Sequence, residues 1–147
     1  MRTGTPTYFP QLATERLDIA LCRAAALVAR AGEVHAVEEG LGVGQQLVLK
    51  MLAAVGPASQ QVLSEELRID RSVMVTICDD LERAGFISRE RNPADRRSYA
   101  VTITAAGQRR LKQAEASVPA FLADSFSTLS ASERRQLSTL LVKLLDV

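Results

Sequence analysis

The sequence lacks tryptophan and has few aromatic side chains of any kind, with two tyrosines and four phenylalanines among its 147 residues. Alanine, leucine and arginine recur instead, which is typical of a mostly helical protein and argues against an all-β fold. The length is that of about one domain, and a domain of this size buries enough surface to support one hydrophobic core.

Cysteine and histidine, two common metal ligands, are also scarce. Cys22 and Cys78 lie too far apart for a CxxC-type metal motif and are too few for a disulfide framework, which indicates a reducing compartment. His35 is the only histidine, whereas a zinc site needs three or four ligands. We therefore expect neither a metal nor any other cofactor.

Long hydrophobic runs are missing from the chain. No run approaches the roughly 20 residues that span a bilayer, and the N-terminal segment lacks the apolar region of a secretory signal. We therefore expect a cytoplasmic protein without a membrane partner. The net charge is only +1, so any surface that binds nucleic acid must be a local basic patch.

Motifs of catalysis are missing as well. The sequence contains no recognisable nucleophile and base pair, glycine-rich phosphate loop or paired carboxylates in a perturbing setting, so we do not expect an enzyme.

Apolar residues at helical spacing predict long helices towards both ends of the chain. One amphipathic helix is expected from Gln11 to about Glu39, and a second from about Gln45 to Val55. Thr104 can cap a helix running towards Phe126, which Pro119 should kink or break. A last helix begins with a capping box at Ser130 to Glu133, and its leucine stripe is larger than one small domain needs.

The middle of the chain predicts two short helices joined by a tight turn. Ser59 caps a helix through Leu67, and Asp70 caps another from Arg71 to about Ala84. This is the outline of a helix-turn-helix. The second helix should bury a stripe at positions i, i+3, i+4 and i+7, formed by Met74, Ile77, Cys78 and Leu81.

After Gly85 the pattern changes from helical to alternating, which predicts a β-hairpin with a turn at Asn92 to Asp95. The hairpin has four arginines and only two acidic residues, so the basic patch that the net charge hides is concentrated there. The arginines are Arg89, Arg91, Arg96 and Arg97.

The stretch from Ser59 to Gly107 carries three marks of a known family. They are DRS at the start of the second short helix, the pattern DxLExxGFIxRExNPxDRR leading into the hairpin, and a strand ending in IT with Gly107 after two alanines. With these marks the chain resembles the MarR (multiple antibiotic resistance regulator) family of bacterial transcriptional regulators, over roughly residues 11–146.

The resemblance implies a mainly α fold with a small β-hairpin wing. A winged helix-turn-helix at 41–107 would be flanked by dimerisation helices, one at 1–40 after an N-terminal arm and the others at 108–147, in one intertwined domain. The homodimer would bind an inverted repeat of double-stranded DNA with half-site centres ~10 bp apart. Such a protein would be cytoplasmic and nucleoid-associated when bound.

The resemblance also implies which residues touch DNA. The start of the recognition helix would present Arg71, Ser72, Val73, Val75 and Thr76 to a major groove. The position of Thr76 often carries arginine in the family, and the later part of this helix is acidic. We therefore expect modest base discrimination from it, with the acidic end away from the DNA backbone.

In the wing, Asp95 and Arg97 match the family's DxR, in which the aspartate holds the arginine for insertion into a minor groove. Arg89, Arg91 and Arg96 would contact phosphate, which gives affinity without sequence information.

The function expected from the resemblance is a repressor released by a small aromatic or phenolic molecule in a cleft lined by the first, second and fifth helices. An architectural DNA-binding protein without an effector is one alternative. A second is a redox-sensing regulator based on Cys22, whose context LDIALCRAA is similar to that of the hydroperoxide-sensing branch of the family. A packed, inert Cys22 is the competing interpretation, and Cys78 is expected in the core.

Overall fold

The fold is mainly helical with one small sheet, as the sequence predicted. The computed structural model describes residues 6–92 and 95–147, with side chains outside 92–98. Its elements, in chain order, are α1 (Phe9–Glu15), α2 (Leu17–Glu39), α3 (Val43–Val55), β1 (Ala58–Ser59), α4 (Gln60–Leu67), α5 (Arg71–Arg83), β2 (Ile87–Asn92), β3 (Asp95–Ile103), α6 (Ala105–Glu115), α7 (Val118–Ser125) and α8 (Ala131–Leu145). The strands form an antiparallel sheet in the order β1-β3-β2.

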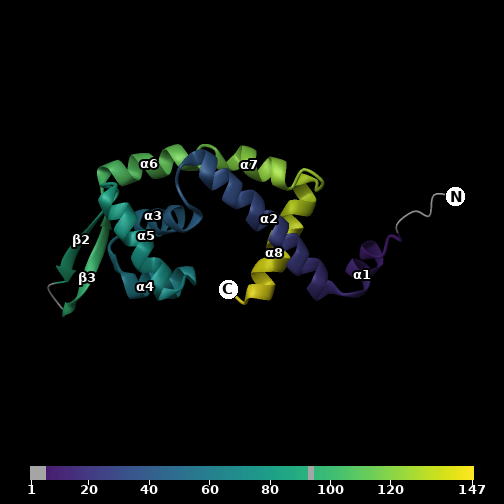
Figure 1. Ribbon diagram of the computed structural model, residues 1–147, viewed down its shortest axis with the longest axis horizontal. Helices are drawn as coiled ribbons and strands as arrows, with labels where there is room; N and C mark the ends of the chain where they lie inside the picture. The colour runs from purple at the N-terminus through teal and green to yellow at the C-terminus, as the bar shows by residue number, and fades with distance from the viewer. Residues whose placement is uncertain (1–5, 93–94) are drawn as a thin grey trace.

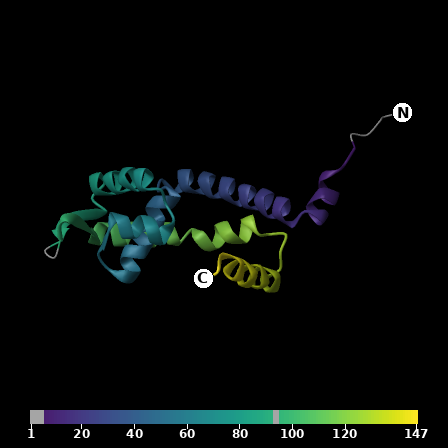
Figure 2. The same ribbon diagram turned by 90° about the horizontal axis from the view of Figure 1, so that it is seen from below.

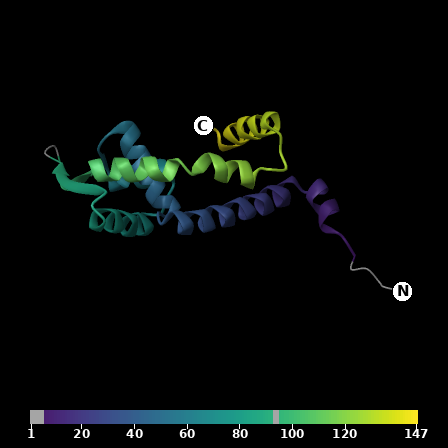
Figure 3. The ribbon, with the colours of Figure 1, turned by 90° about the horizontal axis from the view of Figure 1, so that it is seen from above.

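The chain is elongated, with a lobe at one end and helices extending from it (Figure 1). The lobe contains α3, α4 and α5 with the β2–β3 hairpin at its tip, and α6 leads away from it. α2 and α7 lie next to each other beyond the lobe, and α7 lies between α2 and α8 in Figures 2 and 3. No helix of the described residues is long and apolar enough to cross a membrane.

The predicted helix caps are present, because each needs only a side chain and an amide a few residues away. Ser59 Oγ accepts from the amide of Val62 at 3.1 Å, and Thr104 Oγ1 accepts from that of Gly107 at 3.0 Å. The capping box at α8 pairs Ser130 with Glu133 in both directions. Such a cap stabilises its helix by ~1 kcal/mol.

The single helix expected from Gln11 to Glu39 is wrong, because the chain breaks at Arg16 into α1 and α2. Arg16 is extended (φ −123°, ψ 92°), and its guanidinium pairs with Asp18 in the first turn of α2 at 2.7 Å. The apolar spacing continues across this residue, so periodicity alone does not reveal the break.

The break expected near Pro119 is confirmed, and it comes slightly earlier than the proline. α6 ends at Glu115 and α7 begins at Val118, which makes Pro119 the second residue of a new helix. A proline there costs little because the amide it lacks has no partner in the first turn.

The hydrophobic core lies in the lobe. Its buried side chains are Leu41, Val48, Leu49, Leu52, Leu63, Met74, Cys78, Leu81, Ile87, Val101, Leu111 and Ala114. Each fully buried leucine contributes roughly 1.5–3 kcal/mol. Three members of the expected recognition-helix stripe are in this cluster, and Ile77 packs against it partly buried.

Two features join the hairpin to the helices of the lobe. The two-residue strand β1 pairs Ala58 with Val101 of β3, a contact too short to leave a sequence pattern. The second feature is Gly107, in the first turn of α6, which packs against Phe86 just before β2. A Cβ at position 107 would overlap the Phe86 carbonyl oxygen. This close approach explains why a glycine follows the strand at that spacing.

Candidate nucleic-acid interface

The first two turns of α5 present a mixed polar and apolar surface. Asp70 caps the helix, and Met74 is completely buried, which holds the helix against the core. The side chains around Met74 point outward and are exposed, namely Arg71, Ser72, Val73, Val75 and Thr76. All five residues that the sequence predicted there are therefore exposed in the first two turns of α5.

Ser72 has a defined hydrogen-bond arrangement at the start of α5. Its hydroxyl donates to Asp70 Oδ2, and its amide donates to the same oxygen at 3.3 Å. These bonds hold the pKa of the Asp70 carboxyl below its ordinary value. Because the hydroxyl proton is directed to Asp70, the Ser72 oxygen presents lone pairs outward, which suits a base amino group.

Two of the hairpin arginines, Arg89 and Arg91, differ in their surroundings although the sequence grouped them together. Ile87, Arg89 and Arg91 alternate along β2 and therefore share one face of the strand. Ile87 is buried at the base, whereas Arg91 is exposed nearer the tip. The Arg91 guanidinium carbon lies 6.0 Å from the ring centre of Tyr99, its partner on β3, at the outer limit of a cation–π contact.

Arg89 lies in a different setting from the phosphate contact expected of it. Its side chain is only 20% exposed, and Nη2 lies 2.6 Å from Asp79 Oδ1 and 3.1 Å from Glu82 Oε1. Nη1 donates to Gln60 Oε1 at 2.8 Å. The neighbouring carboxylates, Glu82 first, raise the pKa of Arg89 above its ordinary value, and Arg89 lowers that of Glu82.

The remaining wing residues lie at the start of β3. The strand begins at Asp95, and the side chains of Asp95, Arg96 and Arg97 are outside the described part of the structure. Their contacts with DNA therefore stay predictions.

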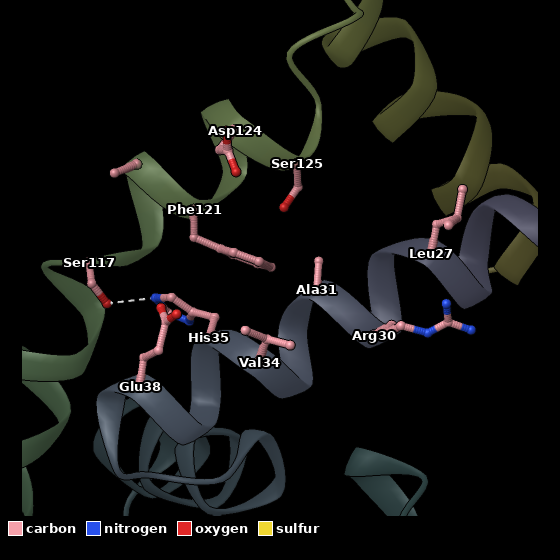
Figure 4. A pocket seen from close by; sticks show the side chains of 11 residues that line it. Leu27, Arg30, Ala31, Val34, His35, Glu38, Ser117, Phe121, Asp124 and Ser125 are labelled. Atoms are coloured by element: carbon pink, nitrogen blue, oxygen red, sulfur yellow. Dashed lines mark hydrogen bonds between the residues drawn. The ribbon is translucent and has the colours of Figure 1, made fainter.

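A pocket lies between α2 and α7 (Figure 4), with a volume of about 670 Å³. Its lining residues are Leu27, Arg30, Ala31, Val34, His35, Glu38, Ser117, Ala120, Phe121, Asp124 and Ser125. The rings of His35 and Phe121 stack inside it, with centroids 4.6 Å apart and planes inclined by 21°. The cleft expected from the sequence included the second helix, α3, which supplies none of the lining residues just named.

One end of this pocket meets a polar network at the junction of α2, α6 and α7. His35 Nε2 lies 3.0 Å from Ser117 Oγ, and Ser117 in turn can donate to Glu39 Oε2 at 3.1 Å. Glu39 also forms an ion pair with Arg110 of α6 at 3.1 Å, with both side chains less than one-fifth exposed. Arg110, and then Ser117, hold the pKa of the Glu39 carboxyl below its ordinary value.

Sequence reasoning missed this network, because the residues that bond each other in it are 71 to 82 positions apart. In the sequence, His35 is notable only as a candidate metal ligand. Among residues 6–92 and 95–147, no three histidine, cysteine or acidic side chains are grouped to bind a metal.

Helices outside the lobe carry large exposed apolar side chains. Leu17 and Leu27 of α2 are 82% and 67% exposed, and Leu140 and Leu144 of α8 are 62% and 65% exposed. Water-exposed leucines in this number are typical of a surface that another protein chain covers.

The two cysteines differ in their exposure to solvent. Cys22 is exposed on α2, beside a hollow between α1 and α2, and its redox role stays a prediction. Cys78 is completely buried, as expected, and burial raises the pKa of its thiol to about 11.

Comparison with known proteins places these features in one family. The MarR family model matches residues 42–99. A putative transcriptional regulatory protein for the hcr operon of Thauera aromatica is 34% identical over 106 residues, which span 72% of this chain and 64% of that protein. An uncharacterised HTH-type transcriptional regulator of Bacillus subtilis is 33% identical, over 72% of this chain and 69% of its own length.

A solved structure shows the same fold over most of the chain. A probable transcriptional regulator from Pseudomonas aeruginosa matches with a TM-score of 0.78 and 25% identity, covering 90% of this chain and 98% of its own. MarR-family proteins are DNA-binding transcriptional regulators rather than enzymes. On the sequence identity, the shared fold and the helix-turn-helix with its wing, this chain belongs to the MarR family.

Proposed function

We propose that this regulator is a homodimeric repressor that binds an inverted repeat of DNA and is released from it by a small aromatic molecule. The observation that carries the proposal is the pocket between α2 and α7, which opens directly onto the polar network joining α2 to the lobe. An HTH-type transcriptional repressor of Mycobacterium tuberculosis, 31% identical over 71% of this chain, supports repression.

The DNA contacts follow from the exposed face of α5 and from the wing. Val73 and Val75 can touch thymine methyl groups, and Ser72 and Thr76 can bond base edges. Arg71 and Arg91 are exposed and can reach phosphates. Arg96 would be a further phosphate contact. In this proposal Asp95 would position Arg97 for insertion into a minor groove.

Dimerisation uses the exposed apolar faces outside the lobe. A second copy packed against α1, α2 and α8 would remove Leu17, Leu27, Leu140 and Leu144 from water, and burial of apolar surface stabilises by ~25 cal/mol per Å². Segments 1–40 and 108–147 then form the dimer interface, and residues 41–107 of each chain form one DNA-binding lobe. A two-fold axis presents two recognition helices to two half-sites.

The ligand chemistry follows from the pocket lining. The stacked rings of His35 and Phe121 offer an aromatic surface, and the Ser117 hydroxyl lies beside them (Figure 4). A planar ring with one hydrogen-bonding substituent fits this combination. Two solved relatives of the same fold, 22% and 23% identical, are described with a natural ligand and with regulation by 6-hydroxynicotinic acid.

Release follows if the ligand prefers one arrangement of the helices. A ligand that bonds Ser117 competes with Glu39 for that hydroxyl, and Glu39 holds Arg110 of α6. The angle between α2 and α6, and with it the separation of the two recognition helices, would then change.

The proposal is tested by selecting genomic DNA fragments with the purified protein, then adding salicylate, 4-hydroxybenzoate or 6-hydroxynicotinate to the best site. We expect an inverted repeat with half-sites about one turn apart, thermal stabilisation by at least one compound, and release of DNA by that compound. Salt-sensitive binding without a motif, and no stabilisation, would support an architectural protein instead.

A further inference from the structure

We propose that Arg89 is a positioning residue, which locks the wing to the helix-turn-helix, and does not contact DNA phosphate. The inference rests on the proposed contacts of α5 and the wing with DNA, because it concerns how those two surfaces are held in register. The proposal gives Arg89 a different role from Arg91, which lies two residues further along the same strand face.

The guanidinium of Arg89 is already occupied. Nε donates to Glu82 Oε2 at 3.2 Å and Nη2 to Glu82 Oε1 at 3.1 Å, which is a forked contact with one carboxylate. Nη2 also donates to Asp79 Oδ1, and Nη1 donates to Gln60 Oε1. These bonds account for four of the five N–H groups of an arginine. A phosphate would have to displace carboxylates that are already bound.

Arg89 and its partners belong to three different elements. Gln60 is the first residue of α4, Asp79 and Glu82 lie one turn apart on α5, and Arg89 is in β2. One side chain therefore ties both helices of the helix-turn-helix to the wing. Ile87, two residues before Arg89 in β2, is buried and fixes this part of the strand against the core.

The same contacts pair with acidic residues of the recognition helix. Asp79 and Glu82 are negative charges on a helix that must approach phosphates, and unpaired they would repel DNA. Arg89 neutralises part of this charge and orients both carboxylates towards the hairpin. Asp79 and Glu82 of α5 thus serve as the attachment of the wing.

The decisive variant is Arg89→Lys. Its matched control is Arg83→Lys, because Arg83 is an exposed arginine of α5 that pairs with Asp80 and has no proposed contact with DNA. Lysine keeps a positive charge that can bind phosphate, but it cannot form the forked contact with Glu82 while also reaching Asp79 and Gln60. We expect Arg89→Lys to lower the ratio of specific to non-specific DNA affinity about tenfold or more. The slope of affinity against salt should stay at the parental value, because no phosphate contact is lost.

Arg83→Lys should keep both the affinity ratio and the salt slope, because lysine can still pair with Asp80. Circular dichroism and sedimentation establish that both variants are folded dimers, and hydrogen exchange should speed up in β2 of Arg89→Lys while α3 is unchanged. An Arg89→Lys protein that binds the specific site like the parent would overturn the proposal.

A second variant, Glu82→Gln, covers the case in which Arg89→Lys does not fold. If Arg89 positions the wing, this variant lowers the ratio of specific to non-specific affinity. If Arg89 is instead a phosphate contact held back by Glu82, the variant binds all DNA more tightly at an unchanged ratio, and the proposal fails. Loss of motif recognition by the parent protein itself would contradict the proposed function rather than this role of Arg89.

Discussion

His35 stacks on Phe121 with ring centroids 4.6 Å apart, and the two rings connect α2 to α7 inside the pocket. The same histidine lies 3.0 Å from Ser117 at the junction with α6. An aromatic surface for a ligand and the polar contacts that hold the lobe are therefore adjacent, and substitutions can separate their roles.

Replacing Phe121 by leucine should remove ligand binding and leave DNA binding intact. Leucine keeps an apolar side chain but cannot stack on His35 or on an aromatic ligand. The measurement is thermal stabilisation by the aromatic acids, together with DNA affinity in their absence. A variant stabilised as much as the parent would place the ligand elsewhere.

The Glu39–Arg110 pair should give the protein a defined acid sensitivity. The pKa of Glu39 is lowered in the folded state, so the pair contributes stability above the carboxyl's ordinary pKa, and this contribution is lost as pH falls through the lowered value. Urea unfolding should show Glu39→Gln less stable than the parent at pH 7, and the difference should shrink below about pH 4.5. An equal difference at pH 7 and pH 3 would contradict the linkage.

The wing residues at the start of β3 should differ in their effect on sequence preference. Arg97→Ala and Asp95→Ala are each expected to weaken specific binding by roughly 10- to 100-fold, the scale of a lost specific contact. Arg96→Ala should weaken binding to all DNA alike and reduce the salt slope by about one per subunit. Binding by Arg97→Ala at parental strength would refute the minor-groove role.

The exposed leucines of α8 should be required for the dimer. Leu140→Asp places a charge on a side chain that is 62% exposed in one chain, so the effect on an isolated chain is small, whereas an apolar interface cannot bury it unpaired. Sedimentation should show a folded monomer with greatly reduced DNA affinity. Gln61→Glu, on the exposed side of α4, is the control.

Cys78 should be chemically inert in the native protein. Burial raises its pKa to about 11, so almost no thiolate exists at pH 8. In a Cys22→Ser background, a thiol reagent such as dithionitrobenzoate should react only after denaturation. Rapid reaction of the native variant would show that the core around α5 opens readily.

The sequence by itself determined the features that depend on neighbours within a few residues. The caps at Ser59, Asp70, Thr104 and Ser130 were predictable because each side chain bonds an amide two or three positions away. The hairpin and the buried stripe of α5 followed from periodicities of two and 3.6 residues. The family resemblance rests on the same local motifs.

Tertiary structure decided the rest. Arg89 and Arg91 look alike in the sequence, but Asp79 and Glu82 lie across from the first, whereas the second is exposed beside Tyr99. His35 and Ser117 meet only because α2 packs on the start of α7. The physical reason is that ion pairs and pockets form between elements, and the partner of a charged side chain is set by packing that no local pattern encodes.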